Sequence, residues 1–203
     1  MFNFCPSCAS KAIFFEKGKL FRCPGCGFHY YHNIAAATGC VISIPDGEVK
    51  RERHHGSQNL SSKKRSSERI LFTVRGKEPA KGKLDLPGGF VDHGEGVLEC
   101  LYRELKEEIG WAPIIQPGVG LSGVFKFFAS FSNVYPYKNI VYNTCDLFFT
   151  IPVPGLRRED LKPQAGEIAE IRFVRPGEID PDDLAFDSTR RAIRAFQEFI
   201  LPR

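Results

Sequence analysis

The segment from Gly89 to Trp111 carries the strongest structural signal in this 203-residue sequence. Between Glu95 and Ile109, apolar residues recur at three- and four-residue steps, which predicts an amphipathic helix with one side in a core. Gly110 follows the last apolar position and suits the left-handed conformation with which many helices end. The apolar positions are Leu98, Leu101, Leu105 and Ile109.

Three carboxylates share another face of this predicted helix. Glu104, Glu107 and Glu108 stand three and four residues apart, so their side chains converge and repel one another unless a cation lies between them. A hard divalent cation such as Mg²⁺ or Mn²⁺ prefers oxygen ligands of this kind. The alternative is an acidic, solvated helix face without a bound metal.

The spacing of the whole segment decides between these two readings. Gly89, five residues, Glu95, seven residues and then RELKEEIGW from Arg103 resemble the Nudix box, G-x5-E-x7-R-E-U-x-E-E-x-G-U. The single departure is Trp111, which stands where the family prefers Ile, Leu or Val. The sequence is therefore similar to Nudix hydrolases, and the resemblance implies an α/β/α sandwich.

The resemblance also implies roles for individual residues. Mg²⁺ or Mn²⁺ would be held by the carboxylates of the three helix glutamates and by the carbonyl of Gly89. Arg103 would orient Glu104, and Glu95 would restrain Arg103. A further catalytic carboxylate is expected before a late strand, where Glu167 follows a glycine and Glu170 is the second choice. The general base would be Glu104 or Glu167.

Two basic residues precede the box. Arg75 and Lys83 are candidates for neutralising substrate phosphates, with ordinary surface charge as the alternative. Between them and the helix, Pro87-Gly88-Gly89 predicts a turn whose missing side chains allow the backbone to approach a ligand.

The N-terminus contains two pairs of cysteines in CxxC spacing. Cys5 and Cys8 form the first pair and Cys23 and Cys26 the second, so four thiolates can complete a closed tetrahedral Zn²⁺ site. The residues between the pairs predict a short hairpin that turns at Lys17-Gly18. We therefore expect a structural zinc ribbon over residues 1–33, stabilised by its metal because it is too small to bury a large core.

The main domain is expected over residues 34–203. Ala35–Ile44 and Ile70–Val74 predict two strands, separated by a basic loop insertion at about 47–68 that we expect to be flexible and solvated. After the box, strands are predicted over Leu121–Ser130 and Ile140–Ile151, then Ile171–Val174. A helix from Ser188 to Leu201 closes the chain.

An aromatic segment, predicted to be turn-rich, separates the two strands that follow the box. It runs from Phe131 to Lys138, and its residues Tyr135 and Tyr137 are candidates for stacking on a base or for packing. Nudix proteins with a zinc ribbon that act as NADH pyrophosphatases carry an SQPWPFPxS string after the box. This sequence lacks the string, which disfavours NADH pyrophosphatase activity.

The resemblance implies a metal-dependent hydrolase that cleaves the diphosphate linkage of a nucleoside diphosphate joined to another moiety. ADP-ribose, ADP-sugars and dinucleotides are all compatible substrates. One alternative is an RNA- or nucleotide-binding module that uses the zinc ribbon and the basic insertion without turnover. A second alternative is a diphosphate isomerase, which would need a catalytic cysteine; Cys40, Cys100 and Cys145 lie in apolar segments typical of inert thiols.

The composition limits which partners and which cellular location we expect. A net charge of +4 does not by itself indicate nucleic acid, and no apolar run approaches the length of a membrane span. The N-terminus lacks the features of a secretory signal, so we expect a cytoplasmic protein that binds no membrane. A homodimer is a hypothesis, since many Nudix enzymes are dimers.

Overall fold

The computed structural model describes residues 2–45, 68–138 and 140–200. Its contacts divide the chain into two compact units, Met1–Ile34 and Ala35–Arg203. The predicted basic insertion at about 47–68 lies outside the described residues, apart from Glu68. In the described part of the chain, no helix is both long and apolar enough to cross a membrane.

The N-terminal unit is a three-stranded antiparallel sheet that carries the cysteine pairs. Its strands are β1 (Phe14–Glu16), β2 (Leu20–Arg22) and β3 (His29–Tyr31). The predicted hairpin is confirmed, with Lys17 and Gly18 in left-handed conformations at its turn. The third strand was not predicted from the sequence, because a run of three exposed residues gives no periodic signal.

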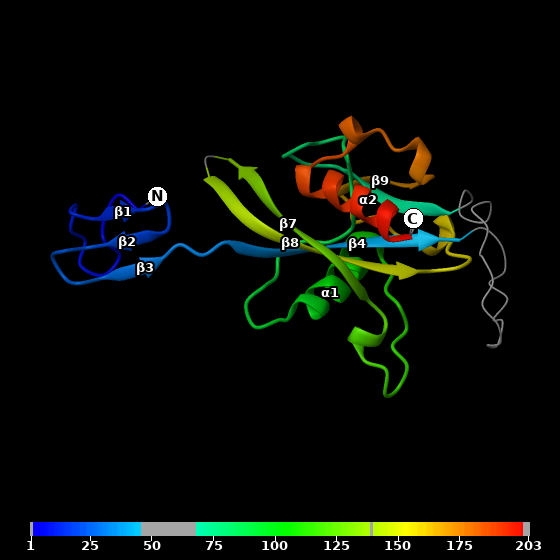
Figure 1. The fold of residues 1–203 in the computed structure, drawn as a ribbon, viewed down its shortest axis with the longest axis horizontal. Coiled ribbons are helices and arrows are strands. Elements are labelled where there is room, and N and C mark those ends of the chain that lie inside the picture. The colour runs from blue at the N-terminus through cyan, green and yellow to red at the C-terminus, as the bar shows by residue number, and fades with distance from the viewer. Residues whose placement is uncertain (1, 46–67, 139, 201–203) are drawn as a thin grey trace. The chain divides into compact units, whose positions relative to one another are not determined.

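The second unit is built on one six-stranded sheet in which β6-β5-β4-β8-β7 follow one another and β9 pairs with the other edge of β5 (Figure 1). Parallel pairing between β4 and β8 is flanked by antiparallel pairs. The strands are β4 (Ala35–Ile44), β5 (Arg69–Arg75), β6 (Leu84–Asp85), β7 (Lys126–Tyr137), β8 (Ile140–Pro152) and β9 (Ile168–Val174).

Two helices cover opposite faces of this sheet (Figure 1). Successive strand residues point to opposite faces, so Ile42 packs under α1 (Val97–Ile109) whereas Val41 packs under α2 (Asp187–Ile200). The same alternation repeats in β5 and β8. The predicted α/β/α sandwich is therefore confirmed. The remaining helices are short 3₁₀ turns: η2 (Leu121–Gly123), η3 (Arg158–Asp160), η4 (Pro176–Glu178) and η5 (Pro181–Asp183).

The box helix has the predicted apolar side and a slightly later start. It begins at Val97, two residues after the predicted Glu95, and Gly110 ends it in the left-handed conformation with φ of 65°. Leu101, Leu105 and Ile109 are fully buried. Leu98 is partly buried against the same cluster.

The segment after the box differs from the prediction. Leu121–Gly123 forms a 3₁₀ turn instead of the start of a strand, and the aromatic segment predicted as a turn is strand up to Tyr137. Pairing along almost the full length of β8 overrides the turn propensity of Pro136. Proline is tolerated there because β7 lies at the edge of the sheet.

The fold predicts a large stability cost for truncating the box helix. We expect Leu105→Ala to lower the free energy of unfolding by about 2–5 kcal/mol, because Leu105 is 0% exposed and its removal leaves a cavity. Urea denaturation followed by circular dichroism measures this change. Ile114→Ala is the matched control, since Ile114 is 90% exposed and its truncation should alter stability little. Equal effects of the two substitutions would contradict this packing.

Candidate active site

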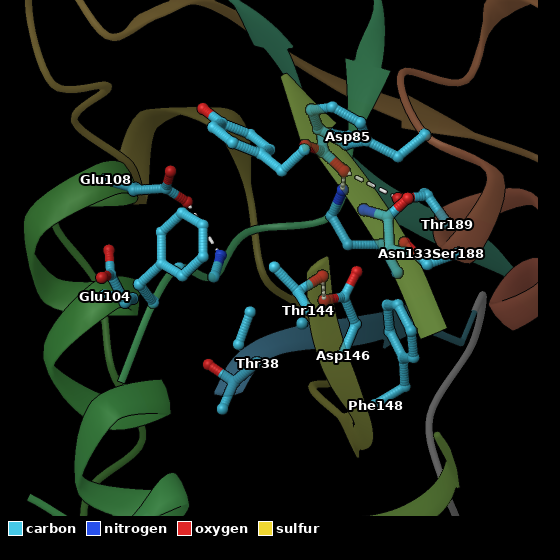
Figure 2. A pocket seen from close by; sticks show the side chains of 18 of the residues that line it. Thr38, Asp85, Glu104, Glu108, Asn133, Thr144, Asp146, Phe148, Ser188 and Thr189 are labelled. Atoms are coloured by element: carbon cyan, nitrogen blue, oxygen red, sulfur yellow. Dashed lines mark hydrogen bonds between the residues drawn. The ribbon is translucent and has the colours of Figure 1, made fainter. Parts of the chain in front are cut away.

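A cavity of about 390 Å³ opens beside the box helix and extends over the sheet (Figure 2). Glu104 and Glu108 of α1 lie on one side of it, and Asp146, Asn133 and Ser188 lie on the other. The glycine turn at Gly88 and Gly89 runs between the two sides and bonds to β4, where the amide of Thr38 donates to the carbonyl of Gly89 at 2.8 Å. The cavity therefore joins the predicted metal-binding helix to a separate polar recess.

Arg103 lines the cavity and holds three acidic side chains in fixed positions. Its Nη2 donates to Glu95 at 2.6 Å, and its Nη1 donates to Glu104 at 2.8 Å and to Glu107 at 3.1 Å. Nη2 also donates to the carbonyl of Phe90 at 3.2 Å, so the guanidinium ties the helix to the glycine turn. The hydrogen bonds from Arg103 lower the pKa of Glu95 to about 2, which keeps Glu95 charged.

Burial destabilises the charged forms of the two inner carboxylates. The pKa of Glu108 is raised well above its usual value, mainly by burial and further by the charges of Glu104 and neighbouring acids, while the Gly88 amide opposes the shift by donating at 2.9 Å. Burial also raises the pKa of Glu104, against the opposing effect of Arg103. Both groups would gain from a cation between them.

The glycine turn allows the helix carboxylates to come this close to the backbone. A methyl group added to Gly89 would overlap the carboxylate of Glu104, and one added to Gly88 would overlap the carbonyl of Thr38. Gly88 also has φ of 149°, which disfavours side chains. Glycine is therefore required sterically at Gly88, whereas a side chain at Gly89 would displace the Glu104 carboxylate from its place at the cavity.

Of three further predicted site residues, Arg75 and Glu167 line the cavity and Lys83 does not. Arg75 lines the cavity, where its Nη1 donates to Asp85 at 3.1 Å and its guanidinium lies 4.9 Å from the ring centre of Phe186. Glu167 also lines the cavity and pairs with Lys77. Lys83 is not among the lining residues and donates to the carbonyl of Asp182 at 2.8 Å.

Two further candidates, Glu170 and Tyr137, do not line the cavity. Glu170 falls inside β9 instead of before it and pairs with Arg172 on the surface. Tyr135 lines the cavity, whereas Tyr137 is exposed and does not. These placements separate the first choice, Glu167, from the second.

Several cavity residues were missed by sequence reasoning. Lys77 lies in a loop without a distinctive motif, and Asp85 belongs to a strand of only two residues. Asp146 had a usable signal, because it is the one charged residue in β8 and lies in the part of that strand that is largely buried. Asn133 and Ser188 gave no comparable signal.

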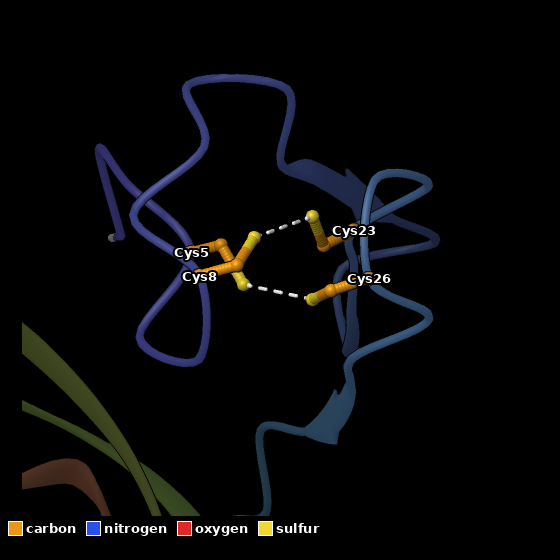
Figure 3. A group of neighbouring side chains, drawn as sticks. All are labelled: Cys5, Cys8, Cys23 and Cys26. Carbon is orange, nitrogen blue, oxygen red and sulfur yellow. Dashed lines mark hydrogen bonds between the residues drawn. The ribbon is translucent and has the colours of Figure 1, made fainter.

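The four N-terminal cysteines converge as predicted (Figure 3). Their sulfur atoms all lie within 4.8 Å of one another, which is a set of donors compatible with one metal ion. Backbone amides support the turns; for example, the amide of Ala9 donates to the carbonyl of Cys5 at 2.8 Å. His32 lies beside Phe15 and Phe21 in ring contacts, consistent with a packing role.

The model of the NUDIX domain matches residues 61–196, more than half of the chain. The chain belongs to the Nudix family. The match contains the whole box, the glycine turn and Glu167.

Named relatives resemble different portions of the chain. An ADP-ribose pyrophosphatase of Methanocaldococcus jannaschii is 45% identical over 53 residues, which are 26% of this chain and 31% of that protein. The NAD-capped RNA hydrolase NudC of Deinococcus radiodurans is 24% identical over 191 residues, 94% of this chain and 55% of the relative. The chain thus spans about a third to a little over half of the length of these relatives.

Solved structures share the fold at low sequence identity. A Nudix hydrolase from Nitrosomonas europaea has a TM-score of 0.58 at 21% identity, covering 96% of this chain and 90% of that one. The Nudix domain of Shewanella oneidensis NrtR, complexed with ADP ribose, also has a TM-score of 0.58, at 16% identity, covering 84% and 91%. These similarities confirm the fold.

The burial of Glu108 predicts that removing its charge changes the stability of the protein in a pH-dependent way. Because the pKa of Glu108 is raised on folding, the native state binds more protons than the unfolded state above the usual pKa, and stability falls as pH rises through that window. In buffer without added divalent cations, we expect Glu108→Gln to raise the melting temperature at pH 7.5. The gain should largely disappear at pH 4.5, where Glu108 is protonated in the native protein.

Differential scanning fluorimetry at the two pH values measures this dependence. Glu159→Gln is the control, because the carboxylate of Glu159 is exposed beside Arg157. A stabilisation by Glu108→Gln of the same size at both pH values would show that charge burial is not its cause.

Proposed function

We propose that this protein is a Mg²⁺-dependent hydrolase that cleaves the diphosphate linkage of a nucleoside diphosphate joined to another moiety, with compounds of the ADP-ribose type as substrates. The observation that carries the proposal is the placement of the Glu104 and Glu108 carboxylates in the cavity wall, with the Arg103 guanidinium bonded to Glu104 and to the half-exposed Glu107 beside them. An acidic surface helix without function would not need its carboxylates buried at a cavity wall.

The donor set fits a hard divalent cation. Glu104 and Glu108 have raised pKa values because their charges are buried near one another, and a cation would relieve that repulsion. The Cα of Gly89 lies against the Glu104 carboxylate, and its carbonyl, which accepts from the Thr38 amide, is a neutral oxygen of the kind that Mg²⁺ and Mn²⁺ sites commonly use. We assign the metal ligands to Gly89, Glu104, Glu107 and Glu108. When bound, the cation supplies charge neutralisation at the phosphate oxygens and acidifies a water molecule.

The protein's own residues would orient and balance the reacting groups. Arg103 holds Glu104 and Glu107, and Glu95 restrains Arg103 through a hydrogen-bonded ion pair. Glu104 and Glu167 are the candidates for the general base, since both carboxylates line the cavity.

Cations on the cavity wall suit a diphosphate. Arg75 is already oriented by Asp85, so its guanidinium needs little further ordering to meet a phosphate. Lys77 pairs with Glu167 and adds a second positive charge to the wall. We therefore replace Lys83, which bonds to Asp182 elsewhere, with Lys77 as a phosphate-binding candidate.

The names of the relatives support this substrate class. ADP-ribose is named for the Methanocaldococcus pyrophosphatase, and NAD-capped RNA for the Deinococcus hydrolase. Both compounds contain a nucleoside diphosphate linked to a further group. The shared chemistry is therefore attack on a diphosphate, while the group beyond it differs.

The isomerase alternative is disfavoured by the state of the thiols. Cys40 is fully buried, and burial raises its pKa, so it is protonated at neutral pH. Burial likewise raises the pKa of Cys100 to about 11. Neither thiol has the thiolate character that a nucleophile needs.

We further propose that Cys5, Cys8, Cys23 and Cys26 bind one structural Zn²⁺. Four sulfur ligands would fill a tetrahedral site and leave no position for a substrate. The metal would stabilise a unit whose own core is small.

The hydrolase proposal is tested with Glu107→Gln. We expect Mg²⁺-dependent release of products from at least one of ADP-ribose, NADH, NAD⁺, diadenosine polyphosphates and ADP-glucose, with kcat about 100-fold lower in the variant because one metal-ligating charge is lost. Glu170→Gln is the control, since Glu170 pairs with Arg172 outside the cavity. If the unmodified, folded protein released no product from any of these compounds, binding without turnover would be favoured.

The zinc proposal is tested by elemental analysis of the full-length protein. We expect about one zinc per chain, and a loss of nearly all of it in Cys23→Ser. Cys145→Ser should keep the metal, because Cys145 lies in β8 and outside the cysteine cluster. Zinc-free protein with a folded N-terminal unit would contradict the assignment.

A further inference from the structure

The recess on the far side of the cavity contains a carboxylate that the proposed chemistry does not use. Asp146 lies in β8 and is only 9% exposed. In the described part of the chain, the hydroxyl of Thr144 is its one hydrogen-bond donor, at 2.5 Å from Oδ1. Asp146 therefore has acceptor capacity on Oδ2 that a ligand entering the cavity could use.

A second polar group in the recess is also unsatisfied. Ser188, near the start of α2, is 0% exposed, and its Oγ has no hydrogen-bond partner among the described residues. Figure 2 shows Ser188, Asn133 and Asp146 on the side of the cavity opposite Glu104 and Glu108. Two polar side chains with spare hydrogen-bonding capacity, Asp146 of β8 and Ser188 of α2, therefore line one recess.

A neighbouring acid shows that this spare capacity is specific. Asp85 lines the same cavity, but it accepts hydrogen bonds from Arg75, from Thr189 at 2.9 Å and from the Leu86 amide at 3.0 Å. Asp85 is thus committed to positioning Arg75. Asp146 is the buried acid of the cavity that remains available to a ligand.

Aromatic side chains form part of the wall of the recess. Ala37 and Gly39 of β4 pair with Asp146 and Phe148 of β8 and line the cavity, and the ring of Phe148 lies directly over Gly39. A methyl group on Gly39 would meet the ring of Phe148 at 2.8 Å. Tyr135 and Phe186 add aromatic walls, with ring centres 5.4 Å apart. Aromatic walls with few polar groups are typical of sites for planar ligands.

Charge fixes which end of a nucleotide enters the recess. Among the described residues, Asp146 makes no ion pair, so its negative charge repels phosphate and attracts a hydrogen-bond donor. The positive charges of Arg75 and Lys77 lie in the cavity wall and attract phosphates instead. A nucleoside diphosphate would therefore place its phosphates near the helix glutamates and its base in the recess.

We propose that Asp146, assisted by Ser188, recognises the exocyclic amino group of the substrate's nucleobase. This inference rests on the hydrolase function proposed above and names the part of the substrate that sets its specificity. Oδ2 of Asp146 accepts from the amine, and the Ser188 hydroxyl bonds to an adjacent ring or carbonyl atom. A base that carries a carbonyl in place of the amine meets the carboxylate with two acceptors facing each other and is rejected.

The test compares mononucleotides that differ only in the base. Isothermal titration calorimetry of the full-length protein with AMP, GMP and IMP measures recognition without turnover. IMP lacks both exocyclic amines, so we expect AMP or GMP to bind at least about tenfold more tightly than IMP. Which of the two is preferred identifies the position of the amine.

Asp146→Asn separates base recognition from a structural role. The amide is nearly isosteric, can still accept from Thr144 and can donate to the carbonyl of IMP. We expect the preference for the amino base to fall about tenfold, with IMP binding improved. Asp187→Asn is the control, because Asp187 is exposed, pairs with Arg191 and does not line this cavity.

Three results would overturn the proposal: equal binding of all three nucleotides, equal weakening of all three by Asp146→Asn, or no binding of any. Equal weakening would indicate that Asp146 contacts the ribose. Hydrolase activity is measured in a separate experiment, as turnover of ADP-ribose and of its deaminated analogue, inosine diphosphate ribose. Binding preference without turnover would reject the hydrolase function and keep the base recognition.

Discussion

The ion pairs of Arg103 are the interaction on which the rest of the site depends. One guanidinium bonds to Glu95, Glu104 and Glu107 and also to the carbonyl of Phe90. Without it, several carboxylates would repel one another on adjacent helix turns, and the glycine turn would lose its link to α1. The arginine thus serves both the fold and the proposed chemistry, because the same bonds that hold the turn also aim the acids at the cavity.

Sequence alone predicted those parts of the molecule that depend on local spacing. The box helix, β4 and the cysteine pairs each have a periodic or motif signal, and the structure has each of them where the sequence indicated. The predicted strand over Leu121–Ser130 was wrong in its first part, and the turn-rich reading of the next segment was wrong up to Tyr137. Long-range pairing with β8 decides both, and such pairing leaves no local pattern.

The residues of the candidate site likewise fall into those that local spacing predicts and those that depend on long-range packing. The glutamates of α1 lie within one motif, so helical geometry alone predicted that they share one side of the helix; in the structure, Glu104 and Glu108 line the cavity and Glu107 does not. Arg75 could be proposed from its position before the box, but its orientation by Asp85 depends on a contact between two strands. The recess could not be predicted, since Asn133, Asp146 and Ser188 come from three elements whose packing had to be known first.

Alternate residues of β4 have two different roles: one set packs in the core and the other lines the cavity. Cys40, Ile42 and Ile44 build the core beneath α1, whereas Ala37 and Gly39 line the cavity on the opposite face. Because side chains alternate strictly, inserting or deleting one residue in the strand would exchange the two sets. Bulky groups would then fill the cavity while small ones left gaps under the helix. Substitutions can therefore tune this strand one position at a time, but a change in its length would remove the binding site and the core packing together.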